Sequence, residues 1–373
     1  MICLIRPPAV DSIRFATTSI SLPLGLGYIA AALERAGLPV HVIDAVGEAP
    51  TIHTRYFKGY LLGLPLEEIV ERIPAGATAV GISVTFTHEW PAAARLVTLI
   101  KAARPDLPVL LGGEHITSMP EFSLMTAPAD YLILGEGEET VVELVAALAK
   151  GGPVADIPGV AYRDGREVVV NRRRSRNVAI DDLPQPAWHH FKIDTYHRHQ
   201  LVGCEHTPDV TMPMLATRGC PYQCTYCSAP NMWSPRWIAR DPKQVVDEIE
   251  SYVERFGARN FPFQDLTAIV RKDWIVSFCQ EILDRGLRIT WRLPSGTRAE
   301  AIDDEVARLL KASGMVSMAY APESGSDETR RFIKKKMHTE KLLESVRSAA
   351  AADLYVMGFM VIGFPHDTPE NLA

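Results

Sequence analysis

The sequence has little of three things: long apolar runs, cysteine and net charge. Its longest apolar run, Leu354 to Phe364, contains two glycines and is shorter than the roughly 20 apolar residues of a membrane-spanning helix. The amino-terminal residues lack the basic segment and the apolar stretch that mark a signal peptide. We therefore expect a cytoplasmic protein that does not enter a membrane.

The charge balance is also modest. The formal net charge is −6 in 373 residues, so we expect no general attraction to nucleic acid or to anionic lipid. Two short basic clusters, 172–176 and Lys334-Lys335-Lys336, are interpreted as solvated surface. Apolar residues make up 47% and charged residues 23% of the chain, which is typical of globular proteins. The length favours two domains.

Three of the six cysteines lie close together, at Cys220, Cys224 and Cys227. A C-x3-C-x2-C array suits one iron–sulfur cluster better than disulfide bonds, and this use of cysteine favours a reducing compartment. A [4Fe-4S] cluster with three protein ligands leaves one iron open, and an open metal position can bind a substrate. The alternative interpretation is a structural zinc site or a chance group of buried thiols.

The first 150 residues alternate β-rich runs with helical periods, which predicts a parallel sheet covered on both faces. The order predicts a flavodoxin-like, doubly wound α/β domain that binds ligands beyond the carboxyl ends of its strands. The expected strands are Ile2–Ile5, Val40–Asp44, Ala79–Thr85, Val109–Gly112 and Tyr131–Leu134. Residues 46–64 are expected to form a long irregular loop.

Small and polar residues end or follow the last three of these strands. They are Ser83, Thr85, Gly112, Gly113, His115, Gly135 and Glu136. Glycine at a strand end lets a flat ligand or a phosphate approach the backbone. We therefore predict a binding site at this edge.

Residues 151–205 predict a β-hairpin with an Asp164-Gly165 turn, followed by a proline-rich linker. From 206 to 373 strands and helices alternate again. The expected strands are Met212–Thr217, Asn260–Gln264, Arg288–Leu293, Val316–Ala321 and Tyr355–Ile362. Candidate site residues follow three of them, at Arg298, at Glu323-Ser324-Gly325 and at Gly363.

The stretch from Arg218 to Ser228, RGCPYQCTYCS, resembles the cluster loop of the radical S-adenosylmethionine (SAM) superfamily. The resemblance implies that SAM binds the open iron and that an electron from the cluster splits it into methionine and a 5′-deoxyadenosyl radical. It also implies a partial (β/α)6 barrel with its active site at the carboxyl ends of the strands.

The same resemblance suggests roles for the remaining site residues of the second domain. Tyr226 and Gly363 are expected near the adenine of SAM. Glu323, Ser324 and Gly325 are expected at its ribose or its methionine portion. Arg298 either pairs with the SAM carboxylate or is a surface arginine.

The amino-terminal strand ends are similar to those of cobalamin (B12)-binding domains. Ser83-Val-Thr85, Gly112-Gly113 and Gly135-Glu136-Gly-Glu match the elements of radical SAM proteins that carry such a domain. The stretch 21–27 lacks the histidine that coordinates cobalt in methionine-synthase-type domains. The resemblance therefore implies base-off cobalamin without a lower histidine ligand, or loss of the cofactor, and it gives His115 an orienting role.

The resemblance implies a cobalamin-dependent radical SAM enzyme that methylates an unactivated carbon through methylcobalamin. The alternatives are a B12-dependent radical SAM cyclase or rearrangement enzyme, and a non-catalytic cobalamin- or SAM-binding sensor. The expected partners are a flavodoxin or ferredoxin as electron donor and a small-molecule substrate. Since the chain stops after the fifth expected strand of its second domain, we expect a C-terminally truncated radical SAM core.

Overall fold

We analysed a computed structural model, which describes residues 1–11, 20–203, 206–365 and 367–372. The chain divides into two compact units, Met1–His206 and Thr207–Ala373. The hairpin and linker segment, residues 151–205, belongs to the first unit. Among the described residues, no helix combines the length and the apolar character needed to cross a membrane.

The first unit is built on a seven-stranded sheet in the order β10-β9-β8-β7-β6-β1-β3. Its parallel strands are β1 (Ile2–Arg6), β3 (Val40–Asp44), β6 (Ala79–Ser83), β7 (Val109–Gly112) and β8 (Tyr131–Ile133). Strands β9 (Val160–Asp164) and β10 (Glu167–Val170) form the predicted hairpin and add antiparallel to β8. The five predicted strands are therefore confirmed in flavodoxin-like order.

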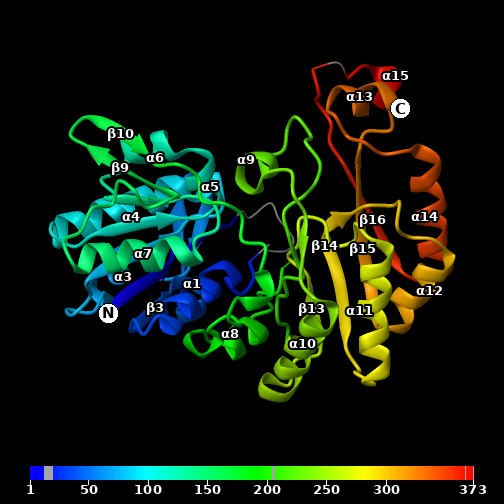
Figure 1. Ribbon diagram of the computed structural model, residues 1–373, viewed down its shortest axis with the longest axis horizontal. Coiled ribbons are helices and arrows are strands. Elements are labelled where there is room, and N and C mark those ends of the chain that lie inside the picture. Colours follow the sequence, from blue (N-terminus) through cyan, green and yellow to red (C-terminus); the bar gives the residue numbers. More distant parts are fainter. Residues whose placement is uncertain (12–19, 204–205, 366, 373) are drawn as a thin grey trace. The chain divides into compact units, whose positions relative to one another are not determined.

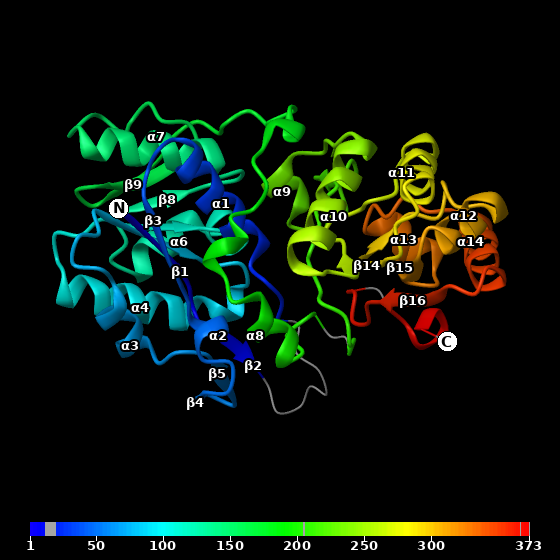
Figure 2. The same ribbon diagram turned by 90° about the horizontal axis from the view of Figure 1, so that it is seen from below.

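Helices cover both faces of this sheet, because its central strands are apolar on both sides. Figure 2 shows α1 (Leu24–Arg35) and α7 (Glu138–Ala149) on one face, and α3 (Leu66–Arg72) and α4 (Trp90–Ala103) on the other. Shorter helices are η1 (Thr87–Glu89), α5 (Glu114–Ser118) and α6 (Pro120–Thr126). The strand order reverses between β1 and β6, and ligands bind at such a switch point in open α/β sheets.

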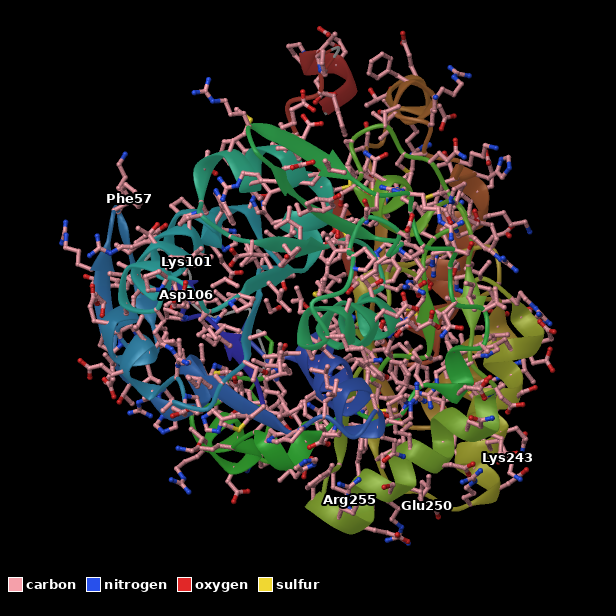
Figure 3. All side chains as sticks on the ribbon, turned by 60° about the vertical axis from the view of Figure 1, so that its left-hand side comes forward. Phe57, Lys101, Asp106, Lys243, Glu250 and Arg255 are labelled. Carbon is pink, nitrogen blue, oxygen red and sulfur yellow. The ribbon has the colours of Figure 1, made fainter. Side chains whose placement is uncertain are left out.

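The expected irregular loop at 46–64 is instead largely regular. It contains α2 (Ala45–Glu48), β4 (His53–Tyr56) and β5 (Gly59–Leu62), and these strands form a small antiparallel sheet with β2 (Ala9–Asp11). The turn places Phe57 at φ 48°, a position that usually selects glycine or asparagine, so the sequence did not signal a hairpin. Figure 3 shows Phe57 projecting from its tip.

The segment after β10 packs against α1. The amide of Ala187 donates to the carbonyl of Gly27 at 3.0 Å, and Glu34 accepts hydrogen bonds from His189 at 2.9 Å and His190 at 2.8 Å. The short helices here are η2 (Ile180–Asp182), η3 (Trp188–His190) and α8 (Ile193–Arg198). This segment is therefore a fixed part of the first unit.

The second unit contains a four-stranded parallel sheet in the order β13-β14-β15-β16. The strands are β13 (Asn260–Pro262), β14 (Thr290–Thr297), β15 (Met315–Glu323) and β16 (Tyr355–Met360). Helices α10 (Pro242–Phe256), α11 (Lys272–Asp284), α12 (Asp304–Ala312) and α14 (Thr339–Ala351) pack in sequence along it, as Figure 1 shows. The remaining elements are β11 (Thr217–Arg218), β12 (Ile238–Ala239), α9 (Ala229–Trp233), α13 (Asp327–Phe332) and α15 (Pro369–Leu372).

The prediction of a regular strand at Met212–Thr217 is wrong. Only isolated parallel bridges join Thr211 to Asn260 and Met214 to Phe263. Pro213 lies between them and has no amide to donate, but the amides of Met212 and Met214 on either side donate to the carbonyls of Asn260 and Pro262 at 3.0 Å each. The segment still lies beside β13 and leads into the cysteine loop.

Helix α10 illustrates how the sequence positions these elements. Asp241 caps it by accepting from the amide of Lys243 at 2.8 Å, and Gly257 ends it at φ 64°. Ile249 and Tyr252 are fully buried on its inner face. Lys243, Glu250 and Arg255 project from the opposite side in Figure 3.

Candidate active site

The three cysteines lie in the loop between β11 and α9. Cys220 and Cys224 are half-buried and Cys227 is exposed, and none forms a disulfide. The amide of Ala229 lies 3.4 Å from the Cys227 sulfur, a contact that suits a thiolate ligand. The three sulfur atoms do not all lie within 4.8 Å of one another. Four-coordinate zinc holds its sulfur ligands about 3.8 Å apart, so at least one pair of these sulfur atoms is farther apart than zinc would hold it.

Two cations act on these thiols. Burial raises the pKa of Cys220 and of Cys224, whereas the charges of Lys335 and Arg298 lower both pKa values. A thiol must lose its proton to bind metal, and a nearby cation favours the charged form. The loop therefore provides three ligands with positive charge beside them.

Glu323 ends β15 in a strained conformation. Its φ is 66°, which costs a non-glycine residue about 1–2 kcal/mol, and the register with β16 is irregular just before it. Burial and the nearby Glu323 carboxylate both raise the pKa of the Tyr226 hydroxyl. The structure thus brings the predicted residues Glu323 and Tyr226 together.

Lys335 is the residue that sequence reasoning missed. Its ammonium donates to Oε1 of Glu323 at 2.9 Å, and the exposed fractions of the two side chains are 11% and 9%. The interpretation of Lys334-Lys335-Lys336 as solvated surface is therefore wrong for Lys335. A run of three lysines gives no signal that the middle one is half-buried, because its partner is supplied by the tertiary fold.

The turn after Glu323 is held by buried polar groups. Arg330, a buried residue, donates to the carbonyl of Ser324 at 2.7 Å, and the Ser324 hydroxyl accepts from the amide of Ser326 at 3.1 Å. A Cβ added to Gly325 would meet no atom within 4 Å. The turn is therefore rigid, with open space over Gly325.

The predicted adenine residues also converge. The rings of Tyr226 and Phe364 lie 5.9 Å apart at 57°. Gly363 has φ 104°, and Asp367 accepts from the amides of Gly363 and Phe364 at 2.8 Å each. An aromatic pair suits a purine ring, which stacks on aromatic side chains.

Arg298 is buried and already engaged. Its guanidinium pairs with Glu300 at 2.6 Å, donates to the carbonyl of Lys336, and lies 4.0 Å over the ring of Tyr222. These contacts argue against a surface arginine. They fix the lysine segment beside the cysteine loop.

Asp265 anchors the start of the cysteine loop. Its carboxylate accepts from the amides of Ala216 and Thr217 at 3.2 and 2.5 Å and from the Thr217 hydroxyl at 2.6 Å. Full burial raises the pKa of Asp265 to about 6. This side chain positions the loop.

In the first unit, the predicted cobalamin residues gather at the carboxyl ends of β6, β7 and β8. Ser83 pairs with Gly112 in register, and Thr85 is exposed. Thr117 links the next two strand ends, since its hydroxyl donates to the carbonyl of Gly113 and accepts from the amide of Gly135. A Cβ on Gly135 would meet no atom within 4 Å, and one on Gly112 none nearer than 3.8 Å. This open backbone fits a flat ligand.

Gly113 has a different reason to be glycine. Its φ is 115°, and a Cβ there would lie 2.3 Å from the carbonyl oxygen of Val84. His115 is buried against Trp90, its Nδ1 lies 3.1 Å from the Thr87 hydroxyl, and burial lowers its pKa. Glu136 accepts from Arg176 and from the amide of Asn177, each at 3.0 Å. These side chains hold the loops that surround the edge.

A buried polar group at the ends of β1 and β3 was also missed. The Tyr196 hydroxyl donates to Asp44 at 2.8 Å and accepts from Arg6. Burial raises the pKa of Tyr196 well above its usual value, so the phenol stays protonated. No local pattern signals this group, because Tyr196 is 152 residues from Asp44 along the chain.

Two family models match the chain. One, described as the B12 binding domain, covers residues 13–145, and the other, the radical SAM superfamily, covers residues 214–373. The chain is a B12-binding radical SAM protein. The matched ranges contain the open strand edge and the three-cysteine loop, respectively.

Three curated proteins are similar in sequence to this radical SAM protein along most of its length. An uncharacterized methyltransferase of Pyrococcus horikoshii is 27% identical over all of the chain and 76% of its own length. The cytidylyl-2-hydroxyethylphosphonate methyltransferase of Streptomyces wedmorensis is 28% identical over 97% of the chain and 72% of its own length. The anaerobic magnesium-protoporphyrin IX monomethyl ester cyclase of Cereibacter sphaeroides is 28% identical over 94% of the chain, which spans 55% of that enzyme.

A solved structure shares the fold. The radical SAM methyltransferase TsrM of Kitasatospora setae, whose structure has cobalamin and a [4Fe-4S] cluster bound, superposes with a TM-score of 0.78 at 20% identity. The match covers 99% of this chain and 71% of TsrM. The predicted fold, a cobalamin-type domain followed by a radical SAM core, is confirmed.

The residues of this radical SAM enzyme fit its expected cofactors. Three thiols beside two cations suit a [4Fe-4S] cluster, the strained Glu323 and the Tyr226–Phe364 pair suit SAM, and the open glycine backbone suits cobalamin. The absence of a lower histidine ligand stays a prediction.

Proposed function

We propose that this protein is a methyltransferase that transfers a methyl group from SAM to an unactivated carbon of a small molecule. The observation that carries the proposal is that one chain matches both the B12 binding domain and the radical SAM superfamily, the second over the range that contains the three cysteines. When bound, the cluster supplies the electron that cleaves SAM, and cobalamin supplies a methyl carrier.

The residues of the second unit have separate tasks in this proposal. Cys220, Cys224 and Cys227 hold the cluster, Asp265 fixes the loop that presents them, and Glu323 with Tyr226 orients SAM. Lys335 and Arg298 add positive charge beside the thiolates. Ser83, Thr85, Gly112, Gly113, Gly135, Glu136 and His115 form or support the cobalamin edge of the first unit.

The test is anaerobic incubation of the cluster- and cobalamin-loaded chain with SAM, a low-potential reductant and candidate acceptors. Methylation predicts equal amounts of 5′-deoxyadenosine and S-adenosylhomocysteine, because one SAM is cleaved and another donates its methyl group. Cys224→Ala should abolish the formation of 5′-deoxyadenosine, and omission of cobalamin should abolish the formation of S-adenosylhomocysteine.

Cyclisation or rearrangement is the second candidate, since a relative at 28% identity is a cyclase. It predicts deoxyadenosine without S-adenosylhomocysteine in the same assay. The proposal places the protein in the cytoplasm with a flavodoxin or ferredoxin as the reductant.

A further inference from the structure

A group of potential metal ligands lies where the segment after β10 packs against α1. Glu34 belongs to the last turn of α1, and His189 and His190 belong to η3. Each residue offers one ligand atom, and the three atoms all lie within 4.8 Å of one another. These residues belong neither to the cysteine loop nor to the strand ends that are expected to bind cobalamin.

Both imidazoles point at one oxygen. The Nε2 atoms of His189 and His190 lie 2.9 and 2.8 Å from Oε1 of Glu34, and the centroids of the two rings lie 4.3 Å apart. Successive residues of a 3₁₀-helix point about 120° apart, so two adjacent rings meet at one atom only around a common partner. Two nitrogens and a carboxylate oxygen therefore converge on one small volume.

The backbone fixes η3 on α1 independently of these side chains. The amide of Ala187 donates to the carbonyl of Gly27 at 3.0 Å, and Trp188 is completely buried. A Cβ added to Gly27 would lie 2.9 Å from the Cβ of Pro186, so the two elements approach closely because this helix position has no side chain. The three ligands thus come from two elements whose spacing is set by other contacts.

Two imidazoles and one carboxylate form a ligand set that suits zinc. Bonds of about 2.0–2.1 Å place the ligand atoms of a tetrahedral zinc ion about 3.3 Å apart, so each nitrogen has to move only about 0.5 Å from Glu34. The side chains of His189 and Glu34 are 57% and 34% exposed, which leaves room for this shift and for water as a fourth ligand. Magnesium and calcium prefer sites made only of oxygen atoms.

We propose that Glu34, His189 and His190 bind one zinc ion, which fastens the segment after β10 to α1. A neutral imidazole that binds through Nε2 keeps its proton on Nδ1, so the charge of the ring does not change. The ion then joins two elements that are far apart in the sequence. This inference does not depend on the proposed function.

The test measures zinc on the full chain with its cluster and cobalamin loaded, so that the cysteine thiolates hold iron. Equilibrium dialysis against chelator-buffered zinc should find about one zinc ion per chain, and X-ray absorption at the zinc edge should show nitrogen and oxygen ligands without sulfur. His190→Gln keeps an N–H for Glu34 but loses the imidazole. This variant and Glu34→Gln should each bind zinc at least about tenfold more weakly.

His199→Ala is the matched control, because His199 is an exposed histidine of the same segment, and it should bind zinc like the wild type. At free zinc about 100 times the dissociation constant, hydrogen exchange of the Ala187 amide should slow about 100-fold in the wild type and in this control. It should not respond to zinc in His190→Gln.

Four results would each overturn the assignment. They are a wild-type chain that binds no zinc, sulfur ligands at the zinc edge, equal zinc affinity in all variants, and an Ala187 amide that exchanges equally with and without zinc. Iron and cobalamin contents that stay the same while zinc is lost in His190→Gln and Glu34→Gln would support it.

Discussion

At some positions of this protein the backbone leaves no room for a side chain, and glycine is required. Gly113 is the clearest example, since its φ of 115° and the 2.3 Å approach of a Cβ to the Val84 carbonyl leave no room for a side chain. Gly135 also has a positive φ, 77°, but open space around it. A substitution at Gly113 therefore tests crowding of the backbone, whereas a substitution at Gly135 tests access of the cofactor to the strand end.

Gly113→Ala should lower the free energy of unfolding of the first unit by about 3 kcal/mol or more, because its backbone region is accessible essentially to glycine alone. Gly135→Ala should cost only about 1 kcal/mol but should weaken cobalamin binding. Urea unfolding of the cofactor-free chain, with cobalamin titration in parallel, measures both. Similar losses of stability in the two variants would contradict the steric argument.

The Tyr196 hydroxyl bridges two charged side chains, Arg6 and Asp44, in the first unit. Tyr196→Phe removes the hydroxyl that joins Arg6 to Asp44. Asp44 keeps the hydrogen bond from the Gly47 amide at 3.1 Å, whereas Arg6 loses its bond to the phenol and lies 3.8 Å from Asp44. We expect a loss of about 2 kcal/mol in the unfolding free energy of the first unit. Tyr162→Phe, for which the described part of the chain shows no hydroxyl bond, should change it by less than about 0.5 kcal/mol. An equal effect of the two substitutions would show that the bridge contributes little.

At the scale of elements, the cysteine loop depends on an anchor outside it. Asp265 follows β13 and binds the backbone that leads into β11, so the loop is fixed to the sheet before the first cysteine. Because burial raises the pKa of Asp265 to about 6, the folded chain keeps a proton that the unfolded chain releases near pH 4. Stability therefore falls as pH rises through this window.

Asp265→Asn should remove that dependence. Between pH 5 and pH 7.5 the wild type should lose about 1 kcal/mol of unfolding free energy relative to the variant. The variant should also be less stable than the wild type at pH 7.5, where Asp265 is ionised, since an amide offers one oxygen where the two carboxylate oxygens accept three hydrogen bonds. Denaturant unfolding at several pH values measures the unfolding free energy of both proteins. Parallel curves of this free energy against pH would rule out a raised pKa of Asp265 in the folded chain.

The elements that the sequence predicted well are those with strong local signals. Apolar runs between turn residues located the strands of the first sheet, and the cysteine spacing located the cluster loop. Other features departed from the local signals. The segment before the cysteines pairs with β13 only through isolated bridges, and Phe57 makes a turn that glycine or asparagine usually makes.

Across the whole molecule, long-range partners could not be predicted. Lys335 is half-buried and pairs with Glu323, which ends β15 at a positive φ. Tyr196 is buried and lies in the segment after β10. Neither partner is encoded by a spacing along the chain. These contacts nevertheless decide which charges stand beside the site.

The central claim is that one chain binds both a SAM-cleaving cluster and cobalamin. The most direct measurement is the iron, sulfide and cobalamin content of the anaerobically reconstituted full chain and of Cys224→Ala. We predict about four irons and one cobalamin per wild-type chain, with cluster iron lost and cobalamin retained in the variant. A wild-type chain that binds no cobalamin, or that holds a single zinc at its cysteines, would contradict the account.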